Sequence, residues 1–226
     1  TQNKNLLNWK HEKISINTNV SGTLAELKIP ALKVSTASAT NINAKALLTN
    51  ITDVKKRSFD VNILPSQFAK KDLAKFVTFS KEAYAKIPNF IALNGSAKGS
   101  LNELMSKVKF SGKELLIDFE AKLSHLAEPN KLAYDANIKE INVTKDFVLA
   151  FVPKEKIPNT IQLPNKIILT GTALGNMNDV KTNMMLDGSF GKVSVNGFIN
   201  SFKNPSNATY DLILKTKVFL LGKLLN

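Results

Sequence analysis

Residues 167–175 read IILTGTALG, and a similar phrase, IALNGSAKG, occupies residues 91–99. The two copies are offset by 76 residues (167 − 91), and both glycines and most apolar residues coincide. A more divergent copy, ISINTNVSG, occupies residues 14–22. Each copy alternates apolar residues with polar or small ones, which is typical of a β-strand with one buried face. The chain therefore contains a related strand three times.

The repeat extends beyond this phrase. An aromatic residue followed by aspartate recurs as Phe59-Asp60, Tyr134-Asp135 and Tyr210-Asp211, in steps of 75 and 76 residues. Shared β-propensity of three unrelated strands is the alternative, but it does not account for so many coincidences in fixed order. A long fixed period is typical of multi-element units in an array. We expect residues 1–226 to form a single array of about three β-repeats, at approximately 10–86, 87–163 and 164–226, cut from a longer protein.

Strict alternation dominates between the turns. In the stretch LLIDFEAKL the residues Leu115, Ile117 and Phe119 share one face, whereas Asp118 and Glu120 share the other. One apolar and one wet face are typical of antiparallel sheets. The sequence therefore predicts a mainly β protein, an elongated antiparallel sheet of β-repeats with short helical crossovers.

One segment has a different period. Residues 65–88, PSQFAKKDLAKFVTFSKEAYAKIP, carry apolar residues at helical spacing between two prolines. This spacing predicts a helix over 66–86 that packs over one end of the sheet. The corresponding pieces are shorter, TKDFVLAFVPKEKIP in the second repeat and KVFLLGKLLN in the third. Each repeat is thus expected to contain about four strands followed by a short helical crossover.

The net charge of +13 comes almost entirely from lysine, because Arg57 is the only arginine. Proteins that bind nucleic acids favour arginine and interleaved aromatic residues. Because the positive charge here is almost all lysine, no nucleic-acid partner is expected. The lysines stand singly between apolar residues, which indicates a solvated outer sheet face. Attraction to anionic lipid head groups is the second interpretation. The chain has no cysteine for disulfides or thiolate metal sites.

Residues for catalysis are scarce. The only histidines, His11 and His125, do not follow the repeat, and the carboxylates are scattered along polar strand faces. The segment GSFGK at 188–192 lacks the spacing of a phosphate-binding loop and is interpreted as a hairpin turn. We therefore expect no enzymatic activity, no cofactor and no metal site.

The ordered set of motifs resembles the TamB/AsmA-like family of Gram-negative envelope proteins, within the repeating β-groove superfamily. The resemblance rests on LPNKIILTGTALGNMNDVKTNMMLDGSFGKVSVNGFI (163–199) and NATYDLILKTKVFLLGKLL (207–225), which carry the pattern Pro-x-x-Ile-x-Leu-x-Gly-x-x-x-Gly followed by Tyr-Asp. It implies an inner-membrane anchor outside this segment, a periplasmic location, and a curved sheet whose apolar groove carries phospholipid. It also implies neighbouring repeats of the same protein as partners, and a TamA-type outer-membrane barrel as a partner of regions outside this segment.

Alternation alone does not show what packs against the apolar face. A second sheet against it would make a sandwich, whereas acyl chains against it would make a groove. The resemblance favours the groove and a lipid-transfer conduit between the inner and outer membranes. The alternative functions are a β-repeat scaffold or chaperone for outer-membrane protein assembly and, third, a sandwich-like adhesin module. The residues expected to line the groove share the apolar phase of their strands: Val108, Phe110, Leu115, Ile117, Phe119, Ile138, Ile167, Leu169, Met184, Leu186, Val193, Val195, Tyr210, Leu212 and Leu214.

Overall fold

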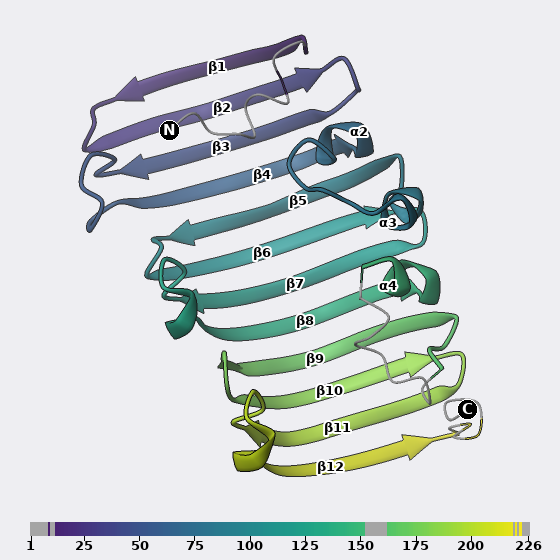
Figure 1. The fold of residues 1–226 in the computed structure, drawn as a ribbon. Helices are drawn as coiled ribbons and strands as arrows, with labels where there is room; N and C mark the ends of the chain where they lie inside the picture. Colours follow the sequence, from purple (N-terminus) through teal and green to yellow (C-terminus); the bar gives the residue numbers. More distant parts are fainter. Residues whose placement is uncertain (1–8, 10–11, 152–161, 219, 221, 223–226) are drawn as a thin grey trace. The chain divides into compact units, whose positions relative to one another are not determined.

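The computed structural model describes residue 9, residues 12–151, residues 162–218, and residues 220 and 222. These residues form a mainly β protein, as the alternation predicts. Twelve strands belong to one antiparallel sheet in which the strand order follows the chain from β1 to β12 (Figure 1). The strands are β1 (Ile14–Gly22), β2 (Glu26–Thr36), β3 (Asn41–Thr49), β4 (Ser58–Ala69), β5 (Phe90–Gly99), β6 (Glu103–Gly112), β7 (Leu115–Ser124), β8 (Ala133–Thr144), β9 (Lys166–Asn176), β10 (Val180–Gly188), β11 (Gly191–Asn200) and β12 (Thr209–Lys217).

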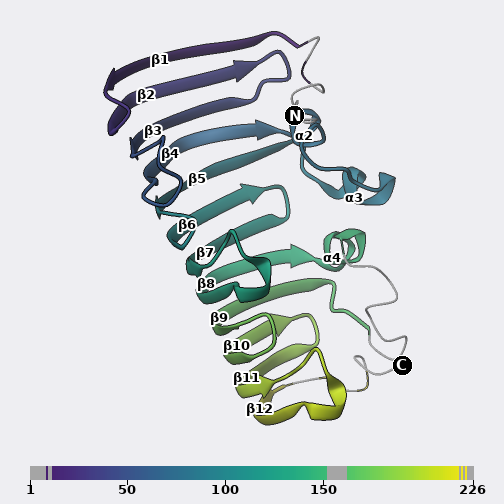
Figure 2. The ribbon, with the colours of Figure 1, turned by 60° about the vertical axis from the view of Figure 1, so that its left-hand side comes forward.

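The helices connect groups of four strands. Helices α2 (Lys70–Leu73) and α3 (Lys81–Lys86) lie between β4 and β5, and α4 (Lys145–Phe151) follows β8 (Figure 2). Two 3₁₀ turns, η1 (Pro129–Lys131) and η3 (Pro205–Asn207), precede β8 and β12. The expected crossover after β12 involves residues 219, 221 and 223–226, and much of the second crossover involves residues 152–161; these lie outside the described residues.

The expectation of one helix over 66–86 is wrong. Strand β4 continues to Ala69, because Phe68 and Ala69 pair with Ile91 and Phe90 of β5. Ser80 then interrupts the helical spacing by acting as the N-cap of α3, where its hydroxyl accepts a hydrogen bond from the Ala83 amide. Long-range strand pairing thus overrides the helical spacing at the start of the expected helix. The Ser80 cap begins a separate helix in its second half.

The chain separates into two compact units. Unit 1 comprises Thr1–Ser100 with Val108–Lys113, and unit 2 comprises Leu101–Lys107 with Glu114–Asn226. Unit 1 thus contains β1–β5 and the end of β6, whereas unit 2 contains the start of β6 and β7–β12. The bounds of the three sequence repeats stay a prediction.

The strand pairing nevertheless repeats in both units. In unit 1, Phe59 of β4 lies opposite Gly99 of β5, and in unit 2, Tyr134 of β8 lies opposite Gly175 of β9. The pairing of β4 with β5 is regular up to Ile63, and the pairing of β8 with β9 is regular up to Ile138. Directly after these positions, β4 and β8 each contain one extra residue that forms a bulge. The shared phrases of the sequence therefore encode a shared register that includes the bulge.

Among the described residues, the buried apolar side chains lie mainly where the helices join the sheet. In unit 1 they include Ala69, Ala83, Ile87 and Ile91 around α2, α3 and the start of β5. In unit 2 they include Val143, directly before α4. The crossovers therefore close one end of the apolar sheet face.

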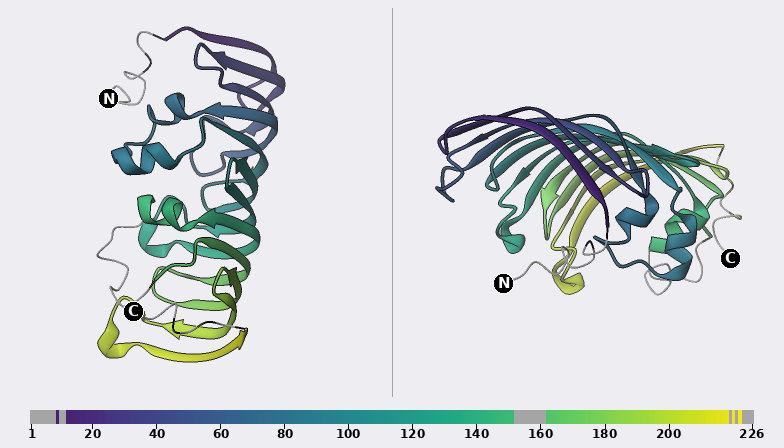
Figure 3. Two further views of the ribbon diagram at one scale, coloured as in Figure 1. Left: turned by 90° about the vertical axis from the view of Figure 1, so that its right-hand side faces the viewer. Right: turned by 90° about the horizontal axis from the view of Figure 1, so that it is seen from above.

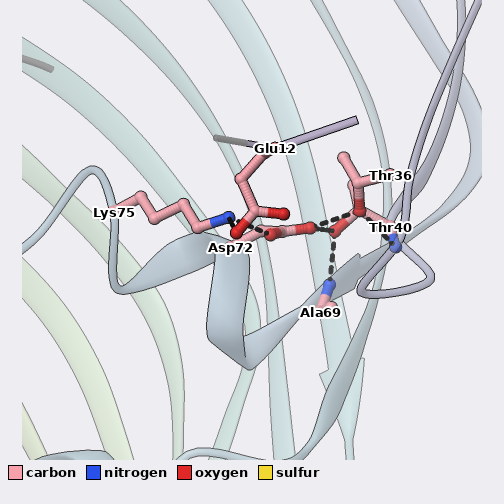
Figure 4. Close-up of polar contacts among 6 residues, drawn as sticks. All are labelled: Glu12, Thr36, Thr40, Ala69, Asp72 and Lys75. Atoms are coloured by element: carbon pink, nitrogen blue, oxygen red, sulfur yellow. Dashed lines mark hydrogen bonds and ion pairs between the residues drawn. The ribbon is translucent and has the colours of Figure 1, made fainter. Parts of the chain in front are cut away.

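A buried carboxylate joins the first crossover to the sheet (Figure 4). Asp72 of α2 has a completely buried side chain, and its Oδ2 accepts hydrogen bonds from the hydroxyls of Thr36 and Thr40, both at 2.6 Å. The Lys75 Nζ lies 3.1 Å from Asp72 Oδ1 and 2.7 Å from Glu12 Oε1. Burial alone would raise the pKa of Asp72, but the bonds from Thr36, Thr40 and Lys75 outweigh it and lower the pKa below its ordinary value of 3.8.

We predict that Asp72→Ala lowers the free energy of unfolding of unit 1 by about 3 kcal/mol, because the buried Thr40 hydroxyl and the partly buried Thr36 hydroxyl lose their shared acceptor and Lys75 loses one of its two carboxylate partners. Urea unfolding measures this loss, and Lys71→Ala, an exposed residue beside it, is the matched control. Since the folded pKa of Asp72 is lowered, its contribution is present above about pH 3.8 and is lost as the pH falls through the folded pKa. Asp72→Asn should lack this acid-dependent part, and an unchanged acid profile in that variant contradicts the assignment.

Candidate functional site

The hairpins of unit 2 bring the predicted apolar residues onto one face of the sheet. Residues directly opposite each other in antiparallel strands point to the same face. Met184 of β10 lies opposite Val195 of β11, and Leu186 lies opposite Leu169 of β9 and Val193 of β11. Three neighbouring strands therefore present their apolar residues together.

The same face continues on both sides of these strands. Leu214 of β12 lies opposite Val195, and on the other side Phe119 of β7 lies opposite Ile138 of β8. Register thus places thirteen of the predicted residues on one face, which we call the unit 2 apolar face: Leu115, Ile117, Phe119, Ile138, Ile167, Leu169, Met184, Leu186, Val193, Val195, Tyr210, Leu212 and Leu214.

The two remaining predicted residues belong to the other unit. Val108 and Phe110 lie at the end of β6, in the segment Val108–Lys113 of unit 1. Both side chains are partly buried and alternate with exposed Lys107 and Lys109. The alternation of β6 is therefore as predicted, but these two residues are not part of the unit 2 apolar face.

The unit 2 apolar face is only partly buried. Leu115, near the helix end, is 6% exposed, whereas Leu214 and Tyr210 on β12 are 63% and 74% exposed. The other ten predicted residues on this face have intermediate burial. A sandwich would require a second sheet against this face, but all strands in the described part of the chain belong to a single sheet. The described residues therefore do not show a sandwich.

The crossover helices lie on the apolar side of the strands. In unit 1, Phe68 of β4 contacts Phe76 just after α2 with ring centroids 6.2 Å apart, and Thr36 of β2 binds Asp72 of α2. In Figure 3 the helices of each unit lie on the concave side of the strands that they join. The helices cover the strand ends, so the partly buried residues farther along the strands are accessible to another apolar molecule.

The opposite face of unit 2 is charged and carries cross-strand ion pairs. Lys192 and Asp187 are opposite residues of β11 and β10, with Nζ and Oδ2 2.7 Å apart. Glu120 accepts from Lys139 at 2.6 Å and from Lys107 at 3.2 Å, and these two hydrogen bonds lower its pKa. Such exposed pairs add little stability, but they identify this face as the solvated one.

Among the described residues, no group of three or more His, Cys, Asp or Glu side chains could hold a metal ion. His125 is an exposed residue in a turn, and His11 lies outside the described residues. Segment 188–192 contains the turn between β10 and β11, where Gly188 pairs with Gly191, so the predicted hairpin turn is confirmed. No helix among the residues described is long and apolar enough to cross a membrane.

The sequence prediction missed the equivalent face in unit 1. There Ala46 of β3 lies opposite Val61 of β4 and Ile29 of β2, and Thr18 of β1 lies opposite Leu32. The register of β2 shifts between Ile29 and Leu32, around Pro30, so apolar residues change phase along the strand. The repeated phrase at 14–22 was the signal that could have extended the predicted surface to this unit.

No family model matches the chain, and no curated protein or solved structure matches it. The candidate site therefore rests on the register, burial and chemistry described above.

Proposed function

We propose that unit 2 binds the acyl chains of phospholipids along its apolar face, as part of a protein that transfers lipid without catalysing a reaction. The observation that carries this proposal is a wide apolar sheet face that is partly buried and has no second sheet against it in the described residues. An acyl chain is a suitable occupant because it is apolar, extended and able to lie across several strands.

The energetics require no enclosed pocket. Burial of apolar surface contributes about 0.8 kcal/mol per CH₂ group, so many weak contacts with Val, Leu, Ile and Met side chains can hold one chain. Such contacts do not distinguish one acyl chain from another, which suits a carrier of mixed phospholipids. Lysines at the strand ends, at the rim of the apolar face, would attract the phosphate without fixing the identity of the head group.

The resemblance to TamB/AsmA-like envelope proteins supports the wider setting of this proposal. In that setting the chain is an internal segment of a longer periplasmic protein anchored in the inner membrane of a Gram-negative bacterium. Lipid would move along successive repeats between the inner and outer membranes. Contacts with a TamA-type barrel would belong to regions outside this segment.

Photocrosslinking can test the proposal at single-residue resolution. A photoreactive amino acid placed at Val195 or Met184 should capture phospholipid, because both positions belong to the unit 2 apolar face. The adjacent Asn196 and the neighbouring Asn183 lie opposite each other on the exposed polar face and are the matched controls. Mass spectrometry of adducts and of extracted lipids measures the result. Equal capture on both faces, or no lipid on folded protein, contradicts the proposal.

The second candidate is a scaffold for outer-membrane protein assembly, and one observation favours it. In the described residues β12 pairs with β11 alone, so its outer edge can accept an extended strand. This function predicts saturable binding of β-rich outer-membrane peptides, with little lipid retained after purification. Lipid analysis of the purified protein therefore separates the two candidates.

A further inference from the structure

A pocket in unit 1, which we call the α2 pocket, lies at the helix end of the sheet. Its volume is about 470 Å³, within the range of about 300 to 1,000 Å³ that is typical of small-molecule sites. Its walls are the turn between β2 and β3, the start of α2, one residue of α3 and the start of β5, and the turn and the helices lie at the same end of the strands (Figure 1). The residues of unit 1 that line it include Ser38, Lys70, Lys71, Tyr84, Asn89 and Phe90.

The polar side chains that line the α2 pocket are all able to donate hydrogen bonds, and no carboxylate of a described residue lines it. Two of them, Lys70 and Lys71, are positively charged, and neither forms an ion pair within the described part of the chain. The adjacent carboxylate, Asp72, is completely buried and binds Lys75 instead. The charge of the pocket is therefore uncompensated, and an anion is the ligand that complements it.

One of the two ammonium groups is held in place before any ligand arrives. The Lys70 Nζ lies 4.6 Å from the centroid of the Tyr84 ring, which is a cation–π contact between α2 and α3. The Lys70 backbone amide also donates a hydrogen bond of 2.9 Å to the Asn89 carbonyl oxygen. A side chain that is already ordered loses less conformational entropy when it binds a ligand.

The turn opposite the lysines is also fixed. Ala39 has a φ of +68°, in the left-handed region that residues with a side chain rarely adopt. Its carbonyl oxygen accepts hydrogen bonds from Gln67 Nε2 at 3.1 Å and from Asn41 Nδ2 at 3.3 Å, which hold this conformation. The neighbouring Ser38 lines the pocket, and its hydroxyl has no hydrogen-bond partner within the described part of the chain. The turn therefore offers a further donor from a defined position.

The junction of β8 with α4 distinguishes what the fold requires from what is particular to the α2 pocket. There the Lys145 amide donates to the Asn165 carbonyl oxygen at 3.0 Å, the same backbone bond that the first crossover forms. The next residue is Asp146, where the first crossover has Lys71. The backbone bond thus belongs to the repeated junction, whereas the pair of lysines does not. A strand-to-helix junction of this kind forms without it.

We propose that the α2 pocket binds the phosphate group of a phosphate ester. Phosphate carries several strong acceptor oxygens, which suits donors that converge from the turn, α2 and α3. Lysine binds phosphate as a point charge, and Tyr84 and the 47% exposed Phe90 provide apolar walls for the organic part of the ester. A soluble ester and a phospholipid head group share this chemistry. The inference does not rest on lipid binding by unit 2, because the pocket belongs to unit 1.

Isothermal titration calorimetry of the whole chain with glycerol 3-phosphate tests the proposal with a ligand that has no acyl chain. We expect saturable binding that Lys71→Asp, which places the residue of the second junction here, weakens at least about ten-fold. Ser38→Ala should weaken it about five-fold. The matched control is Lys55→Asp, the same change of charge at an exposed residue in the turn between β3 and β4. It should bind as the unsubstituted protein does.

Vesicles of phosphatidylcholine with and without phosphatidic acid identify the source of the phosphate. Binding only to the vesicles with phosphatidic acid, lost in Lys71→Asp, supports a lipid head group, whereas binding of glycerol 3-phosphate supports a soluble ester. Equal weakening by Lys71→Asp and Lys55→Asp reflects net charge alone and overturns the site. Equally tight binding of glycerate, which has a carboxylate and no phosphate, overturns the choice of phosphate. Absence of binding to both the ester and the vesicles overturns the proposal, and circular dichroism verifies that each variant is folded.

Discussion

Val195→Asp and Phe119→Asp, singly and together, are expected to leave the sheet folded while reducing bound phospholipid at least ten-fold. Both side chains have intermediate burial on the unit 2 apolar face, on β11 and β7. A carboxylate at an accessible position keeps part of its hydration, so we expect each substitution to lower the free energy of unfolding by about 1 to 2 kcal/mol. An acyl chain laid against the same carboxylate would have to strip that remaining water, which opposes lipid binding.

The matched control is Asn196→Asp, which adds the same charge to the next residue of β11 on the exposed polar face. It should retain phospholipid at the level of the unsubstituted protein. Circular dichroism and urea unfolding measure folding, and mass spectrometry measures phospholipid per protein. If both apolar-face variants unfold, the residues belong to a closed core. If they fold and keep their lipid, the lipid binds elsewhere. Either result contradicts the proposed site.

Gly171→Val should be among the most destabilising single changes in unit 2, with a loss on the order of 3 kcal/mol. Two effects act at this position. The φ angle of Gly171 is +132°, a conformation that residues with a side chain rarely adopt. A Cβ atom there would also lie 2.1 Å from the carbonyl oxygen of Asn183 on β10. Because both obstacles are backbone, neither can be relieved by rotating a side chain.

The control for this prediction is Thr172→Val, the next residue of β9, which is exposed and tolerates a β-branched side chain. Urea unfolding of the two variants should differ by most of the expected loss. Gly171→Ala tests the mechanism further, since it adds only the Cβ atom and should lose a large share of the stability that valine loses. A fully stable alanine variant would show that the strand can move away from β10, and that the close approach is not required.

Much of the sheet follows from the sequence alone, because alternation is a local property. Side chains in a strand point alternately to opposite faces, so Leu115, Ile117 and Phe119 share a face wherever the strand is placed. The repeated phrases likewise indicated equivalent strands, and β1, β5 and β9 carry them. For this reason thirteen of the predicted residues share one face in unit 2, whereas their role in lipid binding stays a prediction.

The tertiary structure decided what depends on partners distant in sequence. Residues 66–69 became strand because β5 supplies pairing partners. Asp72 joins α2 to the sheet because its buried carboxylate binds Thr36, Thr40 and Lys75. No spacing of residues in the sequence predicts this arrangement. Matching glycines also differ, since Gly99 has a φ of +133° whereas its counterpart Gly175 has no left-handed φ. Whether a second sheet covers the apolar face is a question of the same kind. Alternation reveals that a face is apolar, and only the placement of distant strands and helices determines what lies against it.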